Sequence, residues 1–193
     1  MEATENEVIL AFLQAEAQSP RFAAAVSRNY KGNLWDLVYR ADLNDKKQNA
    51  ERRRILGKTR GWGRGKLLFE NLDTSKLRWE RFDDLSFEEV EYWNYVNHPQ
   101  PNALSENSRS VGIGASNVTR KFVPGWSDQI LDIVKQLVRG VPMPPLIALE
   151  ARNGGTYLLE GHTRATAYVL NHTEPITAYI GYWAPAKWCR QRI

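Results

Sequence analysis

The sequence predicts an α+β protein, in which a small mixed β-sheet with helices follows a mainly helical N-terminal extension. Two apolar runs, residues 146–149 and 156–159, flank the turn signal Asn153-Gly154-Gly155, which indicates a hairpin of antiparallel strands. A third apolar run, residues 175–181, follows a helical stretch, and a strand that returns after a helix can pair in parallel. We therefore expect both kinds of pairing in one sheet.

The N-terminal part is predicted to be mainly helical. Apolar residues recur at helical spacing over residues 7–30, with a break at Ser19-Pro20 where a second helix can start. Residues 33–39 add a turn or two, and residues 46–56 form a basic helix. The glycines at positions 57, 61, 63 and 65 then indicate a loop.

The middle of the chain gives weaker signals. Residues 77–82 alternate between apolar and polar side chains, as a strand does. Ser86 can cap a helix that carries Val90 and Trp93. Residues 104–114 look irregular. The chain is accordingly expected to divide into an extension with a basic, glycine-rich loop and a sheet domain, at residues 1–120 and 121–193.

Two helices frame the strands of the C-terminal third. Ser127 and Asp128 offer a cap for the first helix, which Gly140 ends. Thr163 is expected to cap the second helix, and Asn171 can take the left-handed conformation that ends it.

The second helix begins in a compact polar cluster, which we call the 160–164 turn: Glu160, Gly161, His162, Thr163 and Arg164. A strand that enters a helix through a glycine directs backbone N–H groups and the positive end of the helix dipole at one place, where an anion can bind. Arg164 can donate two N–H groups to phosphate oxygens, and Thr163 can hold a phosphate or cap the helix. His162 can donate to a phosphate or transfer a proton near neutral pH. Glu160 can hold a magnesium ion or accept a proton from an attacking hydroxyl.

About residues 127–182 resemble the ParB/sulfiredoxin superfamily, in which a Gly-x-x-Arg box follows the same strand. Free-serine kinases of that superfamily carry Asp-Gly-His-Thr-Arg and transfer phosphate from ADP, and the 160–164 turn differs from that motif only by Glu160. ParB partition proteins carry an acidic and basic box there and bind CTP. Sulfiredoxins have a catalytic cysteine where this chain has His162, and Cys189 lies well beyond the motif, which argues against sulfinic acid reduction.

The resemblance and the residues together predict that the turn binds a nucleotide or another phosphorylated ligand. The cofactor expected is ATP, ADP or CTP with Mg²⁺, bound by Gly161, His162, Thr163 and Arg164. Glu160 and His162 are the catalytic candidates for a phosphotransferase or nucleotide hydrolase, and Glu160 is the metal candidate. Two alternatives stay open: a turn in which Glu160 simply pairs with Arg164, and a binding module that has kept the fold and lost the chemistry.

A non-enzymatic DNA-binding or regulatory protein is the alternative function. Residues 46–66 contain nine Lys and Arg residues against one Glu, although the whole chain has a formal net charge of only +4. Such a segment can bind phosphate backbones, and an indole can stack on bases. The other interpretation is a solvated charged face. The nucleic-acid candidates are Arg52, Arg53, Arg54, Lys58, Arg60, Trp62, Arg64 and Lys66.

Composition suggests a cytoplasmic protein without a membrane partner. The single cysteine, Cys189, cannot form an intramolecular disulfide, which is typical of a reducing compartment. No apolar run has the length of a membrane span, and the first residues are acidic where a signal peptide is basic.

Overall fold

The computed structural model confirms the α+β class and divides the chain into two compact units, Met1–Glu80 and Arg81–Ile193. It describes residues 1–19, 22–63, 74, 77–86, 90–92, 110–120, 125–150, 155–173 and 175–182. Among these residues, no helix has both the length and the apolar character needed to cross a membrane.

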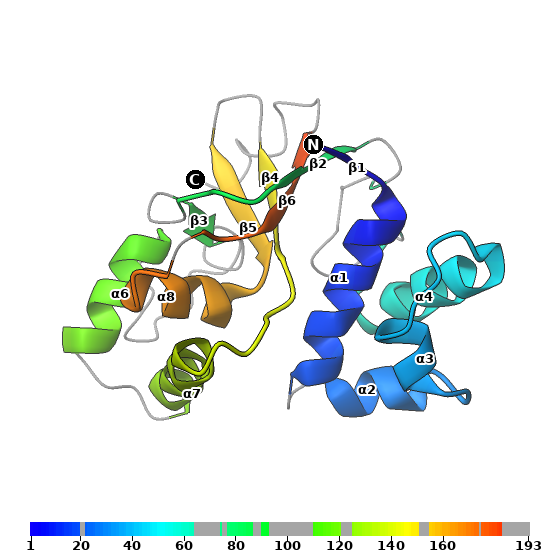
Figure 1. Cartoon of the computed structure of the whole chain (residues 1–193), viewed down its shortest axis with the longest axis horizontal. Coiled ribbons are helices and arrows are strands. Elements are labelled where there is room, and N and C mark those ends of the chain that lie inside the picture. Colours follow the sequence, from blue (N-terminus) through cyan, green and yellow to red (C-terminus); the bar gives the residue numbers. More distant parts are fainter. Residues whose placement is uncertain are drawn as a thin grey trace. The chain divides into compact units, whose positions relative to one another are not determined.

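The first unit is mainly helical, as expected (Figure 1). Strand β1 pairs antiparallel with the start of β2, through Glu2 with Glu80 and Ala3 with Trp79. The break predicted at Ser19-Pro20 separates α1 from α2, and α4 continues beyond the expected residue 56, so Gly57 is helical and buried. The elements are β1 (Glu2–Ala3), α1 (Glu5–Gln18), α2 (Ala23–Arg28), α3 (Leu34–Val38), α4 (Lys46–Thr59) and β2 (Arg78–Phe82), whose last two residues belong to the second unit.

Side chains cap three of these helices. Thr4 and Glu7 form a capping box at α1, because the Glu7 N–H donates to the Thr4 hydroxyl and the Thr4 N–H donates to the Glu7 carboxylate, at 3.3 and 2.7 Å. Asn33 accepts the Trp35 N–H at the start of α3, at 3.0 Å. Asp45 accepts two N–H groups at the start of α4.

The core of the first unit lies between α1 and α4. Phe12 from α1 and Ile55 from α4 are fully buried. The Trp62 ring packs edge-on against Phe12 at 5.9 Å and stacks on Trp79 at 6.0 Å. Aromatic packing of this kind adds to the stabilisation that burial provides.

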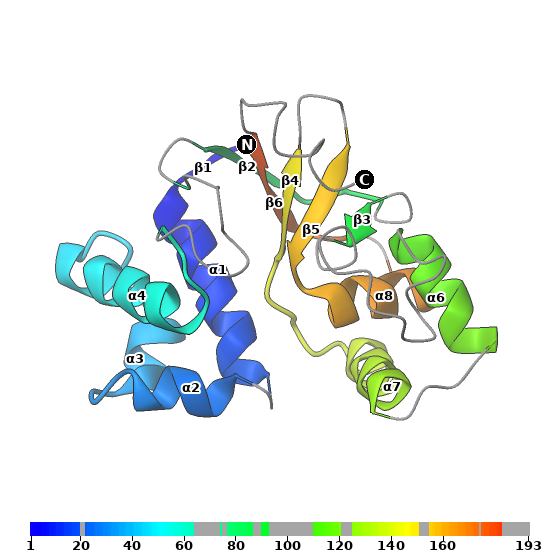
Figure 2. The ribbon, with the colours of Figure 1, turned by 180° about the vertical axis from the view of Figure 1, so that it is seen from behind.

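The second unit contains the predicted mixed sheet, in which β4 lies between β5 and β6 (Figure 2). β4 and β5 form the expected antiparallel hairpin, with Glu150 opposite Thr156. β6 and β3 run parallel to β4 and β5, respectively. The elements are β3 (Glu91–Tyr92), α6 (Val111–Arg120), α7 (Trp126–Val138), β4 (Leu146–Glu150), β5 (Thr156–Glu160), α8 (His162–Leu170) and β6 (Ala178–Tyr182).

Helix α8 supplies much of the core of the second unit. Its Ala165 and Tyr168 pack with Leu146, Leu158 and Ala178 of the three central strands. Four successive β4 side chains are buried, residues 146–149, as expected for a strand covered on both faces. The position of α8, and with it the 160–164 turn, is therefore fixed by the sheet.

The predicted end of the first C-terminal helix is confirmed. Gly140 has φ 70°, and its N–H donates to the Leu137 carbonyl, while the Val141 N–H donates to the Gln136 carbonyl. This is the Schellman pattern, which favours glycine. At the other end, α7 begins at Trp126 rather than after Ser127, and Asp128 accepts the Gly125 N–H at 2.9 Å.

Other predictions differ from the structure. The prediction of a helix from Ser86 is wrong at Glu91–Tyr92, because these residues form strand β3. Their pairing with β5 outweighs the local helical spacing of apolar residues. The irregular segment predicted at residues 104–114 includes the start of α6. The division falls at Glu80 rather than at residue 120, because α6 packs against α8 and so belongs with the sheet. After α8, the residue in the left-handed region is His172, with φ 48°, and not Asn171 as predicted.

Candidate functional site

The 160–164 turn has the strand, glycine and helix order that the sequence predicted. β5 ends at Glu160, Gly161 has φ 97° and ψ 27°, and α8 begins at His162. Gly161 is the N-cap residue and its carbonyl accepts the Ala165 N–H at 2.7 Å, so the prediction that Thr163 caps the helix is wrong. A Cβ atom at position 161 would collide with the Leu146 side chain and lie 3.0 Å from Arg164 Nη2. Glycine is therefore required at this position by both conformation and space.

Arg164 lies beneath the turn rather than on its surface. The residue is 7% exposed, and its Nη1 donates to the Pro144 carbonyl and, at 3.4 Å, to the Pro145 carbonyl. Its Nη2 is 3.7 Å from the Glu160 carboxylate, so the ion pair that the sequence left as an alternative is present. The guanidinium fork predicted for a phosphate is thus directed at protein oxygens and fastens the turn to the segment that enters β4.

The accessible part of the turn consists of three other side chains. Glu160, His162 and Thr163 are each partly exposed, whereas Gly161 is buried. The first N–H groups of a helix have no partner within the helix itself and carry the positive end of its dipole. The turn therefore presents hydroxyl, imidazole and carboxylate groups beside that positive end.

The charge of Arg164 also acts one helical turn further on, at Tyr168. Burial raises the pKa of the Tyr168 phenol, and the nearby Arg164 guanidinium opposes that shift only in part. The Tyr168 phenol consequently stays neutral at physiological pH, and its side chain packs in the core between α8 and the sheet.

The predicted magnesium site has one carboxylate. Within the described part of the chain, no three His, Cys, Asp or Glu side chains lie together as a metal site. Mg²⁺ is often bound by one or two carboxylates together with substrate phosphates, so Glu160 fits a metal that arrives with a nucleotide. The assignment of Mg²⁺ to Glu160 stays a prediction.

The described arginines of the basic segment, residues 46–66, all contact other groups of the first unit. Arg52 is fully buried, and its guanidinium donates to the Leu37 carbonyl at 2.9 Å and the Asp42 carbonyl at 2.8 Å. It also donates to the side chains of Gln48 and Asn49. Burial lowers the Arg52 pKa. These contacts give Arg52 a structural role in place of the predicted phosphate contact.

Arg53 and Trp62 share one acidic partner. Arg53 donates twice to the Glu5 carboxylate, at 2.7 and 2.6 Å, and this hydrogen bonding raises its pKa. The Trp62 indole N–H donates to the same carboxylate at 2.9 Å. Trp62 is only 2% exposed, so the ring that was expected to stack on bases lies in the core.

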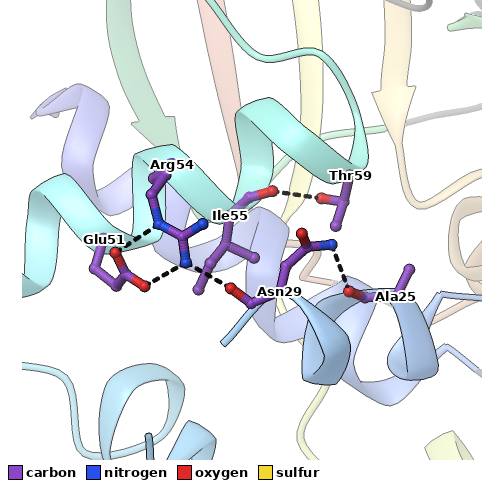
Figure 3. Close-up of polar contacts among 6 residues, drawn as sticks. All are labelled: Ala25, Asn29, Glu51, Arg54, Ile55 and Thr59. Atoms are coloured by element: carbon purple, nitrogen blue, oxygen red, sulfur yellow. Dashed lines mark hydrogen bonds and ion pairs between the residues drawn. The ribbon is translucent and has the colours of Figure 1, made fainter. Parts of the chain in front are cut away.

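Arg54 connects α4 to the end of α2 (Figure 3). Its guanidinium donates to Glu51 at 2.8 and 2.5 Å and to the Asn29 carbonyl at 2.5 Å. Hydrogen bonding to Arg54 lowers the Glu51 pKa. The Asn29 side chain in turn donates to the Ala25 carbonyl, and the Thr59 hydroxyl bonds back into α4.

The remaining nucleic-acid candidates of the segment differ in their surroundings. Arg60 is 3.2 Å from the buried Glu16 carboxylate and lies over the Phe22 ring at 4.3 Å. Lys58 is exposed. Arg64 and Lys66 lie outside the described residues, and nucleic-acid contact at these lysines and arginines stays a prediction.

Sequence reasoning missed the acidic partners of this segment. Glu16 follows Phe12 by four positions, which places both on the apolar face of α1. A carboxylate on a buried helix face needs a cationic partner, and the arginine-rich segment is the evident source. That signal was present in the sequence.

Comparison of the chain with protein-family models, curated proteins and solved structures gives no match.

Proposed function

We propose that the chain binds a nucleotide or another phosphorylated ligand at the 160–164 turn. One observation carries the proposal: Gly161, in the left-handed conformation, brings His162 and Thr163 to the N-terminus of α8, above the buried cation of Arg164. Helix N-termini reached through a glycine turn favour phosphate groups.

Two residues of the turn can contact the ligand, and a third supports them. Thr163 and His162 are partly exposed side chains with groups that can donate to phosphate oxygens, although the His162 Nε2 atom is itself buried. Arg164 supports them, because its bonds to Pro144 and Pro145 hold the turn in place and its positive charge adds to that of the helix terminus. This arrangement differs from the sequence expectation, in which Arg164 itself contacted the phosphate.

The resemblance to the ParB/sulfiredoxin superfamily supports the same ligand class, and phosphoryl transfer or nucleotide hydrolysis is the more specific form of the proposal. Glu160 is placed to accept a proton from an attacking hydroxyl or to hold Mg²⁺ beside the phosphates. Its ion pair with Arg164 keeps the carboxylate at the edge of the turn.

The direct test is isothermal titration of the full chain with ATP, ADP and CTP in the presence of Mg²⁺. We expect binding of at least one nucleotide, and about tenfold weaker binding by Thr163→Ala, because a donor to a charged group contributes about 1.5 kcal/mol. Thr119→Ala is the matched control, since that exposed hydroxyl donates to the Ser116 carbonyl in its own helix.

Absence of heat with all three nucleotides would remove the proposal. Equal weakening by Thr163→Ala and Thr119→Ala would show that binding occurs elsewhere. Release of inorganic phosphate or formation of a phosphorylated product, lost in Glu160→Gln, distinguishes an enzyme from a binding module.

A further inference from the structure

Helix α3 presents an exposed aromatic pair on the first unit. Trp35 is 57% exposed, although tryptophan is one of the residues that bury the most surface in folded proteins. Its ring centroid lies 4.5 Å from that of Tyr39, with the planes tilted by 37°. Tyr39 therefore supports one side of the indole while the indole stays accessible to solvent.

The helix that carries this pair is fixed to the body of the first unit. A helix of five residues is not stable alone. Leu37 and Val38 anchor α3 in the core, and their carbonyls accept hydrogen bonds from Arg52 and Gln14, at 2.9 and 3.1 Å. The buried Arg52 is thus the residue that positions the helix, and Trp35 is displayed on a rigid support.

The chain around the pair has an excess of positive charge, because residues 28–47 contain five Lys and Arg residues against three Asp residues. The three carboxylates make local contacts: Asp36 accepts from Asn33 at 2.6 Å, Asp42 accepts the Asn44 N–H at 2.8 Å, and Asp45 caps α4. By contrast, four cations are exposed and form no ion pair with any residue in the described ranges: Arg28, Lys31, Lys46 and Lys47.

We propose that this surface, comprising Trp35, Tyr39 and the cations of residues 28–47, binds single-stranded nucleic acid. An exposed aromatic ring in a segment with several exposed cations suits a chain of bases and phosphates, in which a base stacks on the indole and the ammonium and guanidinium groups attract the phosphates. Bases in a duplex are already stacked on one another, so a single strand is favoured. Residues 28–47 belong to the first unit and the 160–164 turn to the second, so binding at the two sites can be tested separately.

The test is fluorescence anisotropy of labelled twelve-nucleotide DNA and RNA single strands, titrated with the full chain at low salt. We expect Trp35→Ala to weaken binding about tenfold, within the range for loss of one base stack, and Trp35→Phe to weaken it less. Val138→Ala is the matched control, because Val138 is 72% exposed and belongs to the second unit. This variant should bind single strands as tightly as the unchanged protein does. Far-ultraviolet circular dichroism establishes that each variant is folded.

A second arm measures the salt dependence. The double variant Arg28→Gln, Lys31→Gln should reduce the slope of log affinity against log salt concentration, whereas Arg139→Gln on the second unit should leave it unchanged. No binding of any single strand, or unaltered binding by folded Trp35→Ala, would overturn the proposal. Duplex DNA bound as tightly as single strands would overturn it as well, as would an acidic peptide that binds equally well.

Discussion

At the scale of single residues, a comparison of two glycines distinguishes the effect of backbone strain from the effect of steric crowding. Gly161 and Gly140 both have positive φ, at 97° and 70°. A Cβ atom at Gly140 would meet nothing within 4 Å, whereas one at Gly161 would enter the space of Leu146 and Arg164. Both positions resist side chains, but only one of them also lies against neighbouring atoms.

We expect Gly140→Ala to lower the free energy of unfolding by about 1 kcal/mol, the strain of one left-handed residue. Gly161→Ala should lower it by about 2 to 4 kcal/mol, because overpacking adds to the same strain. Urea unfolding of the two variants measures the difference. Equal losses would show that Leu146 and Arg164 can move aside.

The same residues show why some site features are predictable and others are not. Gly140 and the 160–164 turn depend on neighbours in the chain, so local pattern was enough to find them. The burial and hydrogen bonding of Arg52, Arg53 and Arg54 depend on partners that are distant in the chain. Leu37 lies 15 positions from Arg52, and Glu5 lies 48 positions from Arg53. Adjacent arginines look alike in a sequence, and only the packing of α1 and α3 against α4 distinguishes a buried guanidinium from an exposed one.

At the scale of elements, the sequence predicted those whose signals are local. The α1 to α2 break and the hairpin of β4 with β5 were predicted from proline, from glycine and from two continuous apolar runs. β3 was predicted as helix because its identity is decided by pairing with β5, which comes much later in the chain. The parallel pairing of β6 with β4 was predictable only as a possibility, since it depends on the path of α8.

The contact between α4 and the end of α2 gives a pH-dependent prediction. Hydrogen bonding to Arg54 lowers the Glu51 pKa in the folded protein. A carboxyl with a lowered folded-state pKa stabilises the protein above its unfolded-state pKa, about 4.3 for glutamate, and loses that contribution as pH falls through the folded-state value. We therefore expect Glu51→Gln to lower the urea midpoint at pH 7, and the difference from the unchanged protein to diminish toward pH 3.

The control for this prediction is Asp132→Asn, which removes an exposed carboxylate paired with Lys135 at 2.9 Å. Exposed pairs of this kind contribute little to stability, so this variant should change the midpoint less at pH 7. A Glu51→Gln difference that stayed constant from pH 7 to pH 3 would contradict the assigned pKa shift.

At the scale of the whole molecule, each unit has a core of its own. α1 and α4 enclose the first core, and α8 packs on the sheet to form the second. Units with separate cores can open separately, and native-state hydrogen exchange reports such openings.

We expect Arg52→Met to accelerate amide exchange in α3 and α4 while exchange in β4, β5 and β6 stays unchanged. The substitution leaves the buried Leu37 carbonyl and the partly buried Asp42 carbonyl without the Arg52 donor, which costs about 3 kcal/mol and corresponds to about 100-fold faster exchange. Gly161→Ala should have the reverse pattern, with faster exchange in α8 and the strands of the second unit. If either substitution accelerates exchange in both units equally, the chain unfolds as one cooperative structure, and stability at the 160–164 turn then depends on Arg52 as well.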